Sequence, residues 1–152
     1  GATGLVMDVR NGEIISMVSL PDFNPNQPGD MSGEPAFNRA TKASRQVGST
    51  MKPLSWLALI ESDVDQAASS WVPDDSIERV VNDEIWRPQN YDGEFLGEVT
   101  LGQALAKSRN IPAVHVSEWV GLGPLSEHLH RLGLKDLPLH LFLLHMRGYL
   151  WL

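Results

Sequence analysis

Two apolar, β-favouring segments open the chain at residues 4–10 and 13–19, and the polar pair Asn11-Gly12 separates them. Asn-Gly between two such segments favours a hairpin, because a type I′ turn requires positive φ at both central positions. The pattern therefore predicts an antiparallel hairpin with a two-residue turn. Residues 21–35 contain four prolines and two glycines, and we expect them to form an irregular loop.

Apolar residues with helical spacing follow Gly48-Ser49. The segment from Ser49 to Glu61 is apolar nearly all round, with Pro53 close to its start, so we expect a central, buried helix. Residues 63–92 have weak periodicity and many polar positions. We expect this region to be mainly loop, with one short strand around residues 77–81.

The second half of the chain predicts three more helices. Thr100-x-x-Gln103 has the spacing of a capping box and begins the first, which ends before Ser108. Proline near a helix start and glycine after its end mark the other two, at residues 112–121 and 124–133. A hairpin followed mainly by helices indicates an α+β fold. We expect residues 1–152 to form one domain.

Composition narrows the function. The net charge is −7, so the chain lacks the basic footprint of a nucleic-acid-binding protein. Without cysteine there is no thiolate nucleophile and no cysteine-based metal site, and the five histidines lack metal-ligand spacing. The apolar stretch at residues 137–152 is shorter than the ~20 residues that cross a bilayer, so it predicts a buried C-terminal helix.

The first chemical motif is Ser49-Thr50-Met51-Lys52. Residues three apart share a helix face, so Lys52 can act as a base for the Ser49 hydroxyl if its pKa is lowered. Burial and the positive end of a helix dipole both lower a lysine pKa, and a helix N-terminus offers an N–H to an oxyanion. The alternative is a helix-capping Ser49 with a solvated Lys52.

The second motif is Ser108-Arg109-Asn110, predicted to lie between two helices. The hydroxyl of Ser108 can relay a proton, and the amide of Asn110 can bind both a substrate carbonyl and a lysine. The alternative is that Asn110 caps the helix predicted to start at Pro112.

The two motifs, in this order, resemble the Ser-x-x-Lys and Ser-x-Asn motifs of penicillin-binding transpeptidases and serine β-lactamases. Residues 5–18 resemble the first hairpin of penicillin-binding transpeptidase domains, and residues 20–26 resemble class B members. Three more segments carry the resemblance, the last two to the bifunctional class A members: Phe37-Asn38-Arg39-Ala40-Thr41, Trp86-Arg87-Pro88-Gln89-Asn90-Tyr91-Asp92-Gly93 and residues 99–114. The resemblance spans about residues 4–139 and implies a β-lactamase/DD-peptidase-like α+β fold.

The resemblance implies a serine D,D-transpeptidase that cross-links peptidoglycan and needs no cofactor or metal. Ser49 would attack the D-Ala–D-Ala bond of a stem peptide, Lys52 would activate it, and Ser108 and Asn110 would pass the proton and hold the substrate. Trp86 and Tyr91 would line the substrate groove or else pack against the helices. β-Lactams would acylate Ser49. The resemblance places the parent protein on the extracytoplasmic face of the membrane, anchored by a helix outside this sequence.

The third family motif, Lys-Thr-Gly or Lys-Ser-Gly, is absent from the 152 residues. In the family it lies on a strand that edges the site and supplies an oxyanion N–H, and losing one such donor costs ~10²–10³ in rate. We therefore expect impaired catalysis, a truncated or frame-shifted end after residue 139, and a complementary segment that completes the sheet. The alternatives are a non-catalytic transpeptidase-like fragment, or a serine β-lactamase or β-lactam sensor.

Overall fold

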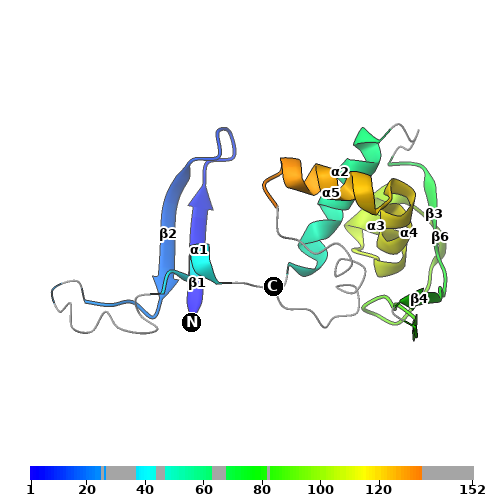
Figure 1. The fold of residues 1–152 in the computed structure, drawn as a ribbon, viewed down its shortest axis with the longest axis horizontal. Coiled ribbons are helices and arrows are strands. Elements are labelled where there is room, and N and C mark those ends of the chain that lie inside the picture. The colour runs from blue at the N-terminus through cyan, green and yellow to red at the C-terminus, as the bar shows by residue number, and fades with distance from the viewer. Residues whose placement is uncertain (25, 27–36, 44–46, 63–67, 82, 135–152) are drawn as a thin grey trace. The chain divides into compact units, whose positions relative to one another are not determined.

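A computed structural model describes residues 1–24, 26, 37–43, 47–62, 68–81 and 83–134 (Figure 1). The chain divides into two compact units, Gly1–Arg45 and Gln46–Leu152, which are described separately. Both strands and helices are present, as an α+β fold requires. The predicted loop at residues 21–35 lies mostly outside the described residues, and the predicted C-terminal helix lies wholly outside them. That residues 1–152 form one domain stays a prediction.

The first unit contains the predicted hairpin. Strand β1 (Ala2–Met7) pairs antiparallel with β2 (Ile14–Leu20), and the short helix α1 (Arg39–Lys42) lies against both strands. Ser19 holds the helix start to β2, because its Oγ donates to Phe37 O (3.0 Å) and accepts from Arg39 N (3.1 Å). The hairpin prediction is confirmed.

The predicted type I′ turn is wrong. The N–H of Asp8 donates to Glu13 O (2.8 Å), so the connection is a four-residue loop over residues 9–12. Gly12 alone in this loop has positive φ (+76°), and its N–H donates to Asp8 O (2.8 Å). The Asp8 carboxylate accepts from the main-chain N–H of Arg10 (2.9 Å) and also from its guanidinium. These local contacts stabilise the longer turn.

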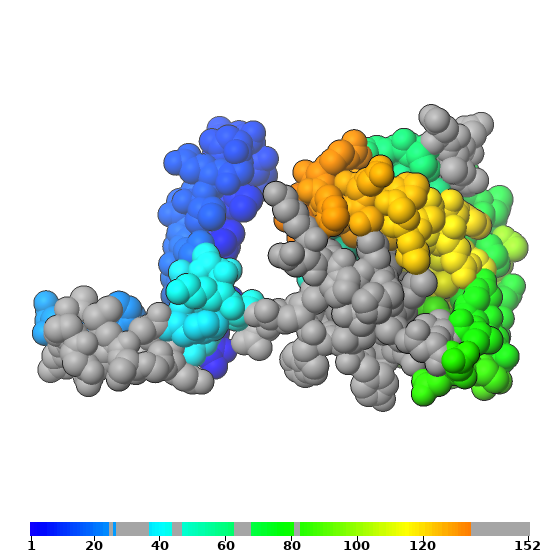
Figure 2. All heavy atoms as spheres, in the orientation of Figure 1, coloured from blue at the N-terminus to red at the C-terminus, as the bar shows by residue number. Residues whose placement is uncertain are grey.

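The second unit has a helical core. The 3₁₀ helix η3 (Gly48–Met51) continues into α2 (Lys52–Glu61), which packs against both α4 (Asn110–Val120) and α5 (Leu122–Arg131). The atoms of α4 and α5 lie side by side on the face shown in Figure 2. Leu57 and Ile60 of α2 are exposed. The helix therefore buries one face against α4 and α5 and leaves Leu57 and Ile60 exposed, so it is less buried than the predicted central helix.

Two small antiparallel sheets accompany these helices. Strand β3 (Trp71–Asp74) pairs with β6 (Gly97–Thr100), and β4 (Arg79–Val81) pairs with β5 (Glu84–Trp86). The strand predicted around residues 77–81 corresponds to β4, whereas the residue pattern does not predict β3, β5 or β6. Strands of three or four residues are too short for a period of two to stand out.

The helix starts are set by local and by distant contacts. Helix α3 (Leu101–Ala106) begins at the predicted capping box: Gln103 N donates to Thr100 Oγ1 (3.2 Å), and Thr100 N donates to Gln103 Oε1 (3.1 Å). Helices α4 and α5 begin two residues before the predicted prolines. For α4 the reason is distant in sequence, because Asn90 Oδ1 accepts the first N–H groups of this helix.

Candidate active site

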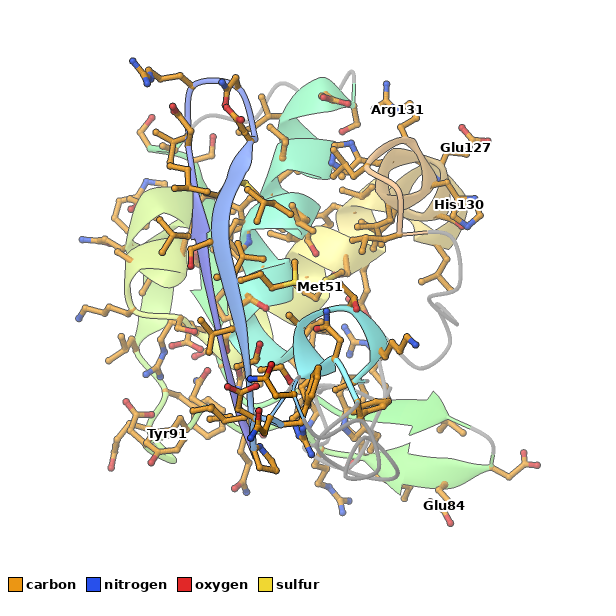
Figure 3. The ribbon with its side chains drawn as sticks, turned by 90° about the vertical axis from the view of Figure 1, so that its left-hand side faces the viewer. Met51, Glu84, Tyr91, Glu127, His130 and Arg131 are labelled. Atoms are coloured by element: carbon orange, nitrogen blue, oxygen red, sulfur yellow. The ribbon has the colours of Figure 1, made fainter. Side chains whose placement is uncertain are left out.

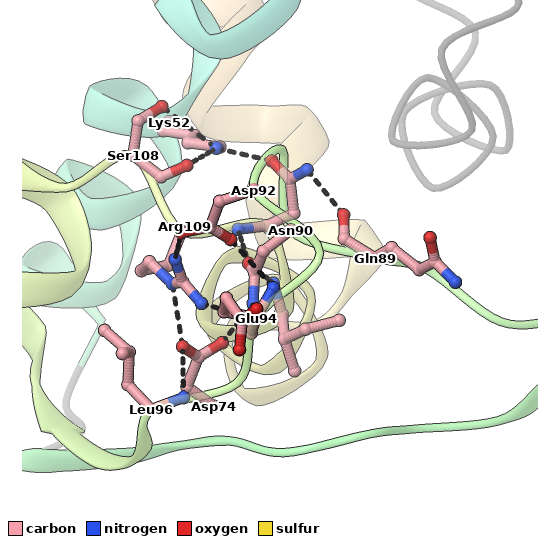
Figure 4. A network of polar contacts seen from close by, with 11 residues as sticks. Lys52, Asp74, Gln89, Asn90, Asp92, Glu94, Leu96, Ser108 and Arg109 are labelled. Atoms are coloured by element: carbon pink, nitrogen blue, oxygen red, sulfur yellow. Dashed lines mark hydrogen bonds and ion pairs between the residues drawn. The ribbon is translucent and has the colours of Figure 1, made fainter.

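Lys52 lies at the start of α2 with only 5 % of its surface exposed. Its Nζ donates to three oxygens: Ser108 O (2.5 Å), Ser108 Oγ (3.1 Å) and Asn110 Oδ1 (2.7 Å) (Figure 4). An ammonium group has three N–H donors, so each one has an acceptor. The structure thus brings Lys52, Ser108 and Asn110 together, although more than fifty residues separate the lysine from the other two.

The environment of Lys52 favours the neutral amine. Burial, and to a smaller extent the nearby positive charge of Arg109, together lower the pKa of Lys52 to about 8. Desolvation penalises the charged form, and a like charge acts in the same direction. A lysine with this pKa is partly neutral near pH 7.5 and can accept a proton. The sequence predicted the burial, whereas the effect of Arg109 is an addition from the structure.

Ser108 has a backbone conformation that is unusual for serine. It lies just after α3 with φ of +52°, where Ser108 N donates to Leu105 O (3.0 Å) and Arg109 N donates to Ala104 O (2.9 Å). This is the Schellman arrangement, whose left-handed position normally holds glycine. A side chain there costs about 1 kcal/mol. The left-handed turn places both the carbonyl and the hydroxyl of Ser108 on Lys52.

Asn110 is the first residue of α4. Its Oδ1 accepts from Lys52 Nζ, and its Nδ2 donates to Gln89 O (2.7 Å). The donor to Gln89 and the acceptor to Lys52 together fix which way the amide faces. The capping position belongs to Arg109, so the alternative in which Asn110 caps a helix starting at Pro112 does not describe this structure.

Ser49 lies in η3, one turn before Lys52, and is exposed. Gly48 precedes it with φ of +53°, a left-handed conformation that glycine adopts without strain. The N–H of Lys52 donates to the Ser49 carbonyl. Among the described residues, no hydrogen bond joins the Ser49 hydroxyl to Lys52. Ser49 is therefore close to Lys52 in the sequence, but its side chain is not hydrogen-bonded to the cluster of Lys52, Ser108 and Asn110.

The two aromatic candidates occupy different environments. Trp86 is the last residue of β5 and is 5 % exposed. This burial favours the alternative in which Trp86 is a packing residue. Tyr91 lies in a turn, and its side chain is fully exposed at the periphery of the molecule (Figure 3). Substrate binding by these two residues stays a prediction.

A buried polar network behind Lys52 was missed by the sequence analysis. Arg109 Nε donates to Asp74 Oδ2 (2.7 Å), and Arg109 Nη1 donates to Asp92 Oδ2 (2.7 Å). Asn90 Nδ2 donates to Asp74 Oδ1 (2.7 Å) and to Glu94 O (2.9 Å). Asp74 is completely buried. Figure 4 shows this network of polar contacts. One feature of the sequence could have pointed to this network: Arg109 lies inside the second motif, between Ser108 and Asn110.

The described part of the chain contains no group of three or more His, Asp or Glu side chains that could hold a metal ion. No helix in that part is long and apolar enough to cross a membrane. The predicted metal-free chemistry stays a prediction.

Comparison with known protein families shows to which family the chain belongs. The family model described as the penicillin binding protein transpeptidase domain matches residues 2–141. The chain belongs to the penicillin-binding protein transpeptidase family. Penicillin-binding protein 1B of Buchnera aphidicola is 36 % identical over 136 residues, which are 89 % of this chain and 17 % of that protein. Penicillin-binding protein 1A of Neisseria cinerea is 33 % identical over 142 residues, covering 90 % of this chain and 16 % of the relative. The chain thus spans about a sixth of their length.

Solved structures agree with this family. Penicillin-binding protein 1A from Haemophilus influenzae matches 64 % of this chain and 14 % of its own, with a TM-score of 0.60 and 32 % identity. Pseudomonas aeruginosa PBP2 matches 85 % of this chain and 32 % of its own, with a TM-score of 0.70 and 24 % identity, a likeness of fold alone. The resemblance drawn from the two motifs and the expected transpeptidase-like fold are confirmed.

Proposed function

We propose that this chain carries the acylation chemistry of a peptidoglycan D,D-transpeptidase. The observation that carries the proposal is the buried Lys52 ammonium held by Ser108 and Asn110. A lysine with a pKa of about 8 can take the proton of a serine hydroxyl at neutral pH. The Ser-x-x-Lys spacing and the family membership make Ser49 the nucleophile of this proposal.

The proposed step balances as an acyl transfer. The Ser49 oxygen bonds to the penultimate D-alanine carbonyl of a stem peptide, and the bond to the terminal D-alanine nitrogen breaks. The Ser49 proton passes to neutral Lys52 and, through the Ser108 hydroxyl, to the departing amine. An amine of a second stem peptide then takes the acyl group and restores the serine. A β-lactam amide follows the first half of this sequence.

Lys52 must lose a proton before it can act as the base for Ser49, and this changes its three hydrogen bonds. The ammonium has three donors and three acceptors, so it offers no lone pair to Ser49. The neutral amine keeps two donors and gains one lone pair. It can therefore remain bound to the Ser108 loop while accepting a proton from Ser49.

The partners and location follow from the family and belong to the proposal. The substrates are peptidoglycan stem peptides, β-lactams are inhibitors, and the parent protein works on the extracytoplasmic face of the membrane. We expect slow acylation, because the 152 residues contain no Lys-Thr-Gly or Lys-Ser-Gly motif. The complementary segment stays a prediction.

Labelling with a fluorescent penicillin, followed on denaturing gels, tests the proposal. The chain should give a covalent band that forms slowly and is absent in Ser49→Ala. The unbound Ser49 hydroxyl and the missing third motif favour a second candidate, a transpeptidase-like fold without catalysis. Folded protein that never gives a band supports this second candidate. Rapid turnover of nitrocefin would instead support a β-lactamase.

A further inference from the structure

We propose that Asn90 is a positioning residue for the Lys52 site, holding the first turn of α4 so that Asn110 Oδ1 meets Lys52 Nζ. The inference rests on the proposed function, in which Lys52 is the base. Within the described part of the chain, the Asn90 side chain makes no hydrogen bond to Lys52 or Ser49. It acts through Asn110.

Every hydrogen-bonding position of the Asn90 amide is used. Asn90 is 5 % exposed, and its Nδ2 donates to Asp74 Oδ1 (2.7 Å) and Glu94 O (2.9 Å). Its Oδ1 accepts from Asn110 N (2.7 Å) and more weakly from Ile111 N (3.4 Å). The nitrogen meets only acceptors and the oxygen meets only donors, so a single amide orientation satisfies all four contacts.

The oxygen of Asn90 supplies what α4 lacks at its start. Arg109 occupies the capping position, and its side chain makes no capping hydrogen bond. An uncapped helix start leaves N–H groups without partners. Asn90 provides this cap from a distant loop and so fixes the backbone of Asn110.

The residue next to Asn90 fixes the side chain of Asn110. Gln89 O accepts from Asn110 Nδ2 (2.7 Å), which turns Asn110 Oδ1 toward Lys52 (2.7 Å; Figure 4). Residues 89 and 90 therefore hold Asn110 at both its backbone and its side chain. The buried Asp74 carboxylate anchors this arrangement, because one of its oxygens binds Asn90 and the other binds Arg109.

The test is the titration of Lys52, followed by NMR of ¹³C-labelled lysine in the full chain, which contains only four lysines. The signal of Lys52 is assigned with Lys52→Met. Loss of the Asn110 acceptor disfavours the ammonium, so Asn110→Ala should lower the titration midpoint by about one pH unit. Asn90→Ala should lower it in the same direction. The double variant should move it no further than Asn110→Ala alone, because coupled residues are not additive.

Two controls separate positioning from stability. Gln89→Ala removes an exposed side chain and keeps the main-chain carbonyl that the site uses, so the midpoint should not move. Leu129→Ala opens a cavity in α5 and should lower the melting temperature without moving the midpoint. Asn90→Ser shortens the side chain and removes the amide oxygen that accepts from α4, so it provides the same test if Asn90→Ala does not fold.

A folded Asn90 variant with an unchanged Lys52 midpoint, or with an effect that adds to that of Asn110→Ala, would overturn the inference. The readout does not depend on acylation. A chain that is never acylated but shows the coupled shifts contradicts the proposed function alone. If the chain is acylated at Ser49 but the Lys52 midpoint does not change in the Asn90 variant, only the inference is contradicted.

Discussion

The two halves of the candidate site differ in how firmly the fold holds them. The Ser108–Asn110 segment is bound to Lys52 through three oxygens and is supported by a buried network. The Gly48–Met51 turn, in contrast, presents Ser49 to solvent, with no hydrogen bond from its hydroxyl to the described residues. The fold thus holds Lys52, Ser108 and Asn110 together, whereas the Ser49 side chain is not held by a hydrogen bond to them.

This difference gives Lys52 two duties. As an ammonium it joins α2 to the loop between α3 and α4. In the proposed function, the neutral amine accepts the proton of Ser49. Because its pKa is about 8, the two forms are close in free energy near neutral pH.

Removal of the base should have the largest effect. Lys52→Ala should slow labelling by a fluorescent penicillin by ~10²–10⁴-fold, the usual contribution of a general base. The matched control is Lys107→Ala, because Lys107 is next to Ser108 in the sequence but is exposed. Equal labelling rates for both variants would show that Lys52 is only a structural tie.

Removal of Asp74, which anchors the buried network, should have the next largest effect, a loss of folding stability. Asp74→Ala leaves the buried guanidinium of Arg109 without its innermost partner, and we expect a loss of about 3–5 kcal/mol in unfolding free energy. Urea denaturation measures it. Asp75→Ala, at the next and exposed position, should change stability by less than about 0.5 kcal/mol. Similar losses for the two variants would contradict the role assigned to the network.

The pH dependence should report the balance between the two forms of Lys52. The lysine pKa is lowered on folding, so the labelling rate should rise about tenfold per pH unit below pH 8 and level off above it. The unfolded chain still binds the proton between pH 8 and about 10.5, so the contribution of Lys52 to stability should rise with pH in that window. A labelling rate that keeps rising to pH 10 would mean an ordinary, solvated lysine.

The smallest effect should come from the backbone of Ser108. Ser108→Gly and Ser108→Ala both remove the hydroxyl from Lys52, but only glycine relieves the left-handed conformation. We therefore expect the glycine variant to be more stable than the alanine variant by about 1 kcal/mol. Thermal denaturation of the pair measures this difference, and equal melting temperatures would argue against strain at this position.

The predictable part of this molecule is the part specified by local sequence. The hairpin, the capping box of α3 and the two motifs each lie within a few neighbouring residues, so their patterns are readable. The start of α4 depends on Asn90, twenty residues earlier, and the conformation of Ser108 depends on a Schellman turn without glycine. Strand β3 forms by pairing with β6, which is distant in the sequence, and β5 forms by pairing with the equally short β4. Such non-local contacts leave no periodic signal.

The most direct test of the central claim is to locate the penicillin adduct by peptide mass spectrometry in the chain, Ser49→Ala and Lys52→Ala. The account predicts slow labelling at Ser49, no adduct in Ser49→Ala, and a strongly reduced yield in Lys52→Ala. An adduct at another residue, or none on protein that circular dichroism shows to be folded, would contradict it.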